Sequence, residues 1–133
     1  GLMIKEAKEF VINVPRASYV KEVDLAGVLS GKDTDKFKKL KFTALNSSKI
    51  KAPIIKECPV NIECRVVEIK PLGSHDMFIA EVLAVQADEE LLDKEQNIDY
   101  KKADPFVYNQ GGYFSLLEKI GHYGFSKEDS YVR

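Results

Sequence analysis

The feature that most constrains the fold is a run of strand-forming residues at 58–91, which one cluster of turn residues divides. Before the turn, apolar side chains recur at every second position, as Val60, Ile62, Cys64 and Val66. This period of two is typical of a β-strand with one buried face. The intervening set, predicted to face water, is Asn61, Glu63, Arg65 and Val67. After the turn, residues 77–85 are almost all apolar, which indicates a strand covered on both faces. A long β-hairpin is therefore predicted.

The turn of this hairpin, residues 71–76, combines Pro, Leu and Gly with the polar residues Ser74, His75 and Asp76. Pro and Gly favour turn geometry, and the polar side chains would lie together at a strand end. A neutral imidazole at His75 is suited to donating a hydrogen bond to a ligand or to holding a nicotinamide ring. A histidine bonded to nearby backbone is the structural alternative. We expect this turn to belong to any site that the chain has.

Short helices are expected at residues 1–9, 18–28 and 99–103, with one more between residue 34 and the lysines that follow it. The predicted caps are Ser18 for the second helix and Asp33 or Thr34 for the next. A last helix is predicted from a capping box, Ser115 with Glu118, to Gly124. Short strands or extended segments are expected at residues 10–14, 42–45, 51–55 and 106–108. This pattern predicts a single domain over residues 1–133, mainly β with helical insertions in a β-barrel core.

The net charge of -1 gives no electrostatic reason to expect binding to nucleic acid or to an anionic membrane. No stretch is long and apolar enough for a membrane span, and no signal-peptide pattern is present. The two cysteines, Cys58 and Cys64, would lie about 20 Å apart along one strand, too far for a disulfide. Unpaired thiols fit a reducing cytoplasm. No zinc-ligand spacing occurs, so no metal site is expected.

Other candidate chemistry has a structural alternative in each case. Ser30, Gly31 and Lys32 follow a predicted helix and offer backbone N–H groups and an ammonium to a phosphate, although helix capping explains the same residues. Tyr108 and Tyr113 flank a Gly-rich loop and are suited to stacking on a planar ring, although packing explains them too. No catalytic triad or GxSxG motif is present. The residues alone therefore indicate a mostly β domain without a self-sufficient catalytic constellation.

Five stretches resemble, in order and spacing, the flavin reductase-like, FMN-binding split-barrel family, and in particular its flavoredoxin branch. They are EFVINVP, AGVLSGKDTDKF, KAPIIKECPVNIECRVVEI, LGSHDMFIAEV and PFVYNQGGYFSLLEKIGHYGFS, which begin at residues 9, 26, 51, 72 and 105. The last two carry most of the resemblance. Ala80 stands where the family pattern has Gly.

The resemblance implies an antiparallel, Greek-key split β-barrel that acts as a homodimer and binds FMN near the dimer interface. The flavin would take hydride from NADH or NADPH, or electrons from another carrier, while the protein binds and shields it. The site residues implied are Ser30, Gly31, Lys32, Lys51, Ala52, Pro53, Ser74, His75, Tyr108 and Tyr113. His75 would face the nicotinamide side as the catalytic candidate, and the two tyrosines would cover the flavin or reach the other subunit.

Family members carry further residues before the segment with which this chain begins, and these supply the first barrel strands and a grip on the FMN phosphate. The resemblance therefore implies a barrel that is incomplete at the N-terminus. One alternative is a non-catalytic, dimeric remnant of the family that has lost tight flavin binding. Another is a subunit that binds a planar ligand other than flavin.

Overall fold

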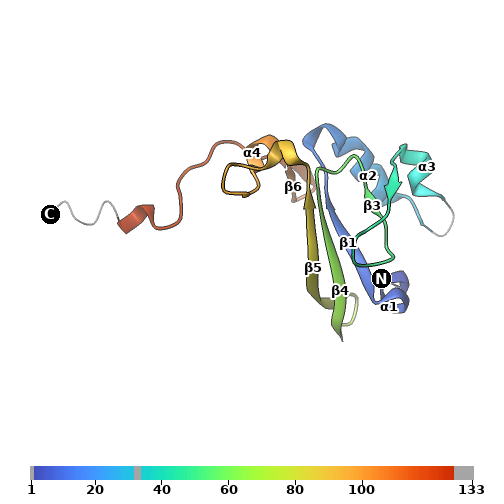
Figure 1. The fold of residues 1–133 in the computed structure, drawn as a ribbon. Coiled ribbons are helices and arrows are strands. Elements are labelled where there is room, and N and C mark those ends of the chain that lie inside the picture. Colours follow the sequence, from blue (N-terminus) through green and yellow to red (C-terminus); the bar gives the residue numbers. More distant parts are fainter. Residues whose placement is uncertain (1, 32–33, 128–133) are drawn as a thin grey trace.

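The predicted hairpin forms the centre of the fold, as β4 (Val60–Pro71) and β5 (Asp76–Ala87) (Figure 1). The computed structural model describes residues 2–31 and 34–127. β4 is the middle strand of a three-stranded antiparallel sheet in the order β1-β4-β5, where β1 is Glu9–Val14. The register places Val11 of β1 opposite Glu63 of β4. Two register shifts between β4 and β5 are β-bulges, which increase the local twist of the hairpin.

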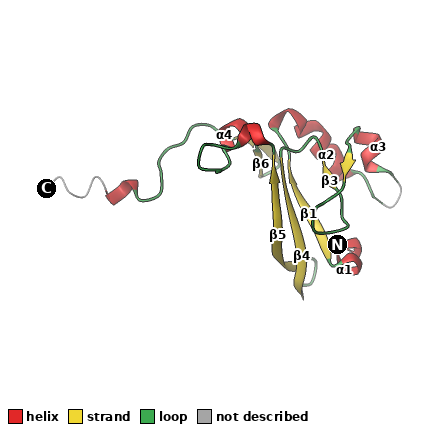
Figure 2. Ribbon diagram, in the orientation of Figure 1, coloured by secondary structure: helices red, strands yellow, loops and turns green. Residues whose placement is uncertain are grey.

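The elements on the N-terminal side of the hairpin are short. They are α1 (Leu2–Ala7), a 3-10 turn (Ala17–Tyr19), α2 (Val20–Val28), α3 (Lys36–Leu40), β2 (Ala44–Leu45) and β3 (Ile54–Ile55) (Figure 2). β2 and β3 form a small antiparallel sheet of their own. The three helices and three short strands predicted in this part of the chain are thus present, with shorter bounds except for β1, which begins one residue earlier than predicted.

Two predicted helix caps are wrong. Tyr19, not Ser18, is the N-cap of α2, and no side chain caps that helix. The N-cap of α3 is Asp35, whose carboxylate accepts a hydrogen bond from the Lys38 N–H, so Thr34 is not the cap. The alternative cap, Asp33, lies outside the described residues. A carboxylate at this position also complements the positive end of the helix dipole.

The elements that follow β5 are a 3-10 turn (Glu89–Leu91), α4 (Tyr100–Ala103), β6 (Phe106–Asn109), β7 (Gly112–Ser115) and a last 3-10 turn (Phe125–Lys127). α4 is the predicted helical turn at 99–103, and Asp99 caps it by accepting from the N–H groups of Lys101 and Lys102. β6 and β7 pair as a hairpin, with positive φ at Gln110 and Gly111. Positive φ at both central residues matches the twist of a tight β-hairpin.

The predicted helix at 115–124 is wrong. Ser115 ends β7, and residues 116–124 form no helix. This segment runs away from the sheet (Figure 1), and Leu117 and Ile120 are 87% and 99% exposed. A helix this short takes most of its stability from packing of its apolar face, so a capping box without a packing surface is not sufficient to form it.

The alternation predicted along β4 is wrong at two positions. Asn61 and Glu63, expected to face water, are buried, because the segment before β3 covers that face of the sheet. On β5 the apolar side chains of Met77, Ile79, Val82 and Val85 are exposed. The described part of this chain therefore does not cover both faces of β5, contrary to the prediction.

A small core lies where β4 meets the chain that follows β5. Val60, Leu91 and Ala103 are buried together, and Val14, Ile62, Ala87 and Ile98 pack around them. Cys58 and Cys64 are free thiols, as predicted, and both are buried, but Cys58 lies just before β4 and not on the same strand as Cys64. Burial, followed by the nearby charge of Glu57, raises the pKa of Cys58 to about 11, so this thiol stays protonated.

Among the described residues, no helix has the length and apolar character needed to cross a membrane.

We predict that Leu91→Ala lowers the free energy of unfolding by about 2–5 kcal/mol, because Leu91 is only 1% exposed and its loss leaves a cavity in the core. Urea unfolding followed by circular dichroism measures this. Leu117→Ala is the matched control, since the same substitution at an exposed side chain should change stability by less than about 0.5 kcal/mol. Equal effects of the two changes would contradict the assignment of the core.

Candidate functional site

The segment at residues 46–53 has no helix or strand, and side chains of the sheet hold its backbone. Glu63 accepts hydrogen bonds from the backbone N–H groups of Ser48 at 2.8 Å and Lys49 at 2.7 Å. Glu9 accepts from the N–H groups of Lys51 at 2.7 Å and Ala52 at 3.0 Å. Two carboxylates thus provide acceptors that a neighbouring strand would otherwise supply.

Glu63 is a fully buried carboxylate, at 0% exposure. Besides the two backbone N–H groups, the Ser48 hydroxyl donates to it at 3.0 Å and the Gln86 side-chain amide donates to the same oxygen. Burial alone raises the pKa of Glu63, but the hydrogen bonds from Ser48, Lys49 and Gln86 outweigh burial and lower it to about 2. The group is therefore ionised in the folded protein at neutral pH.

Glu9 and Asn13 lie on β1 on the same side of the sheet as Glu63, because alternate residues share a face and Glu63 is paired with Val11. The Asn13 side-chain oxygen accepts from the Ile55 N–H at 3.0 Å, where the segment enters β3. These three side chains form a row of acceptors. The row binds the backbone of the chain that crosses the sheet from residue 48 to residue 55.

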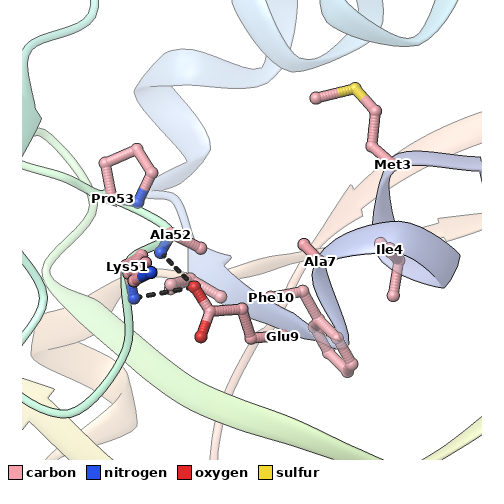
Figure 3. A pocket seen from close by; sticks show the side chains of 9 residues that line it. Met3, Ile4, Ala7, Glu9, Phe10, Lys51, Ala52 and Pro53 are labelled. Carbon is pink, nitrogen blue, oxygen red and sulfur yellow. Dashed lines mark hydrogen bonds between the residues drawn. The ribbon is translucent and has the colours of Figure 1, made fainter.

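The held segment forms one wall of a pocket of about 620 Å³ (Figure 3). Residues from three elements line it: Met3, Ile4 and Ala7 of α1, Glu9, Phe10 and Val11 of β1, and the predicted site residues Lys51, Ala52 and Pro53. This volume is within the range of small-molecule sites. The lining residues are apolar apart from Glu9 and Lys51, a composition that suits a flat, largely apolar ring.

An ion pair joins the hairpin turn to α1, the helix that lines the pocket. The Lys5 ammonium on α1 is 2.7 Å from the Asp76 carboxylate at the start of β5. Within the turn, the Ser74 hydroxyl lies 2.9 Å from His75 Nδ1, and Gly73 has the positive φ that the turn requires. His75 is exposed, and its Nδ1 atom has the Ser74 hydroxyl as a hydrogen-bond partner.

The remaining predicted site residues are grouped at α2. The Tyr113 hydroxyl donates to the Asp24 carboxylate of α2 at 2.9 Å, and this bond raises the pKa of Tyr113. The Tyr108 ring is 5.3 Å from that of Tyr113. Ser30 and Gly31 are exposed just after α2, and Lys32 lies outside the described residues. The described site residues therefore form two groups. Those at 51–53 and 74–75 lie near α1, and Ser30, Gly31, Tyr108 and Tyr113 lie near α2.

Sequence reasoning missed Glu9 and Glu63, which shape the pocket wall. For Glu63 the available signal was that it, like Asn61 and Arg65, alternates with the apolar residues at the start of the strand. Polar residues on a water-facing side give the same pattern, so the pattern alone does not separate a buried glutamate from an exposed one.

No group of His, Cys, Asp or Glu in residues 2–31 and 34–127 is arranged to hold a metal ion.

Comparison with known proteins places the chain in a family. The sequence profile of the flavin reductase-like domain matches residues 3–117. The chain belongs to the flavin reductase-like family. An uncharacterized protein of Archaeoglobus fulgidus is 43% identical over 99 residues, which cover 74% of this chain and 56% of that protein. The chain spans about half the length of the curated relatives it matches.

Solved structures agree with this assignment. Flavoredoxin of Desulfovibrio vulgaris (Miyazaki F) superposes with a TM-score of 0.87 at 29% identity, over 93% of this chain and 67% of that one. Flavoredoxin from Methanosarcina acetivorans gives a TM-score of 0.86 at 29% identity, over 96% of this chain and 68% of that one. The predicted fold, mainly β and of the split-barrel flavin reductase type, is confirmed.

We predict that Glu63→Gln lowers the free energy of unfolding by about 1–3 kcal/mol at pH 7, because the amide cannot accept from all the donors around it. The folded-state pKa of about 2 lies below the ordinary 4.5, so the ionised carboxylate stabilises the fold above pH 4.5. That contribution is lost as the pH falls from 4.5 towards 2. The difference between wild type and variant in urea unfolding should therefore shrink over this pH range.

The control is Glu68→Gln, the same change at an exposed position on the same strand. It should leave the pH dependence of stability as in wild type. A Glu63→Gln profile parallel to that of wild type between pH 2 and pH 7 would show that the Glu63 carboxylate is not the stabilising group.

Proposed function

We propose that this chain is the flavin-binding part of an FMN-dependent oxidoreductase of the flavin reductase or flavoredoxin type. The observation that carries the proposal is the pocket at Lys51, Ala52 and Pro53, formed within the region that matches the flavin reductase-like domain. The flavoredoxin structures superpose over nearly the whole chain, which supports a flavin as the ligand. A flavin supplies hydride and electron transfer, so the protein needs no nucleophile of its own.

The lining of the pocket fits the ring system of a flavin better than its phosphate. Apolar side chains of Met3, Ile4 and Phe10 give van der Waals contact to a flat ring and exclude water from it. The Glu9 carboxylate would repel a phosphate, and it already occupies the N–H groups of Lys51 and Ala52. The phosphate grip therefore comes from groups outside this pocket.

In this proposal the turn residues serve the electron donor. His75 is exposed on the turn that Lys5 ties to α1, so its imidazole is available to hold the nicotinamide of NADH or NADPH. The Ser74 hydroxyl beside Nδ1 limits the orientation of the ring.

Tyr108 and Tyr113 lie near α2, where they would cover a flavin that extends from the pocket or contact a second subunit. The exposed apolar residues of β5 support a homodimer, and the free thiols support a cytoplasmic location.

Absorbance from 300 to 550 nm, before and after FMN addition and desalting, tests the proposal. We expect a retained flavin band with shifted maxima. Met3→Glu should weaken FMN binding about tenfold, because it places a charge in the apolar wall and loses contact worth about 1.4 kcal/mol. Leu2→Glu is the matched control, since Leu2 is exposed on the same helix but does not line the pocket. No retained flavin in wild type would favour the non-catalytic remnant.

His75→Ala should leave FMN affinity unchanged. It should lower kcat/KM for NADH about tenfold, because it removes one hydrogen bond worth about 1.4 kcal/mol. Stopped-flow bleaching of the flavin band under anaerobic conditions measures the rate. Ser74→Ala, which removes only the partner of the imidazole, should have a smaller effect. An unchanged rate in His75→Ala would remove His75 from the site.

A further inference from the structure

One wall of the proposed flavin pocket is an irregular segment, and its backbone is anchored on buried groups of the sheet. We propose that Glu63, which lies outside the pocket, is a positioning residue that sets the place of Lys51, Ala52 and Pro53 in that wall. The inference rests on the proposed flavin function of the pocket. It rests structurally on the bonds of Glu63 to the backbone of Ser48 and Lys49.

The segment needs such an anchor because it makes few regular backbone bonds. Residues 46–53 lie between β2 and β3 without strand or helix, and an ordered backbone costs about 1–2 kcal/mol of entropy per residue. The N–H groups of Ser48 and Lys49 are bound by Glu63 at one end of the segment. The N–H groups of Lys51 and Ala52 are bound by Glu9 at the other end.

The two anchors are connected within the segment. The Ser47 hydroxyl donates to the Ala52 carbonyl oxygen, which closes the chain between them into a loop. Ser48, which follows directly, is the residue that Glu63 holds through both its N–H and its hydroxyl. A shift of Ser48 is therefore transmitted to Ala52, whose side chain lines the pocket.

The chemistry of Glu63 points to positioning and not to stability alone. A buried carboxylate is costly to desolvate, and an apolar side chain at such a position is often as stable or more stable. The donors around Glu63 in the described structure are two backbone N–H groups, a hydroxyl and an amide, so its bonding capacity is directed at the segment and at Gln86. Buried charges retained at such a cost can specify one arrangement of the chain.

Amide hydrogen exchange by NMR on the flavin-free protein tests the anchor directly. In Glu63→Gln the N–H groups of Ser48, Lys49, Lys51 and Ala52 should exchange at least about tenfold faster than in wild type. In Glu9→Gln only those of Lys51 and Ala52 should do so, because Glu63 still holds the other two. Unchanged exchange at Lys51 and Ala52 in Glu63→Gln would overturn the inference, whatever the protein binds.

FMN titration of the same variants tests the consequence for the pocket. Glu63→Gln should weaken FMN binding about tenfold and shift the absorbance maxima of the bound flavin. Two controls apply: Glu68→Gln, and whichever of Leu91→Val or Leu91→Ala loses the same stability in urea. Both should bind FMN as wild type does with unshifted maxima. Equal weakening in the Leu91 control would show a stability effect alone and would overturn the inference.

Ser48→Ala keeps the test decisive if Glu63→Gln does not fold. It removes only the hydroxyl bond to Glu63, and we expect about threefold weaker FMN binding with faster exchange at Lys49 and Ala52. Wild-type affinity and exchange in this variant would overturn the inference. Wild-type protein that binds no FMN would overturn the proposed function, and the exchange data would then still report whether Glu63 holds the loop.

Discussion

The pairing of β4 with both β1 and β5 is the interaction on which the other elements depend. Its ladder satisfies the backbone groups on both sides of β4, so this strand is the one that can carry buried side chains along its first half. Val60 then reaches the small core with Leu91. Glu63, three residues further along and next to a bulge, lies beneath the irregular segment.

The sheet organises the pocket through side-chain acceptors. Glu9 and Asn13 on β1 and Glu63 on β4 project from one face and together bind five backbone N–H groups of the chain that crosses it. The four bonds to Glu9 and Glu63 are charge-assisted, and such bonds are about twice as strong as neutral ones, which offsets part of the cost of burying the Glu63 anion. The irregular segment is thereby bound to the sheet, and Lys51, Ala52 and Pro53 within it line the pocket.

Under the proposed flavin function, the chain needs no catalytic constellation of its own. A flavin brings the reactive atoms, so the protein is required to supply a shaped apolar surface and a few orienting groups. In the proposed function, the pocket at α1 and the exposed His75 would meet that requirement, and the described residues include no group of His, Cys, Asp or Glu arranged to hold a metal ion. The exposed apolar side chains of β5 show that further surface is available for association.

The sequence by itself determined the hairpin, its turn, the helical turn at 99–103 and the family, because these depend on local periodicity, turn chemistry and motif order. Tertiary structure alone decided which polar side chains are buried. Glu63 has the sequence pattern of a surface residue, and it becomes buried because a segment about fifteen residues away in the chain donates hydrogen bonds to it. The helix expected at 115–124 shows the converse, since its local signals are sound but no packing surface supports it. Local signals report what a segment can form, whereas burial and partners depend on contacts between distant segments.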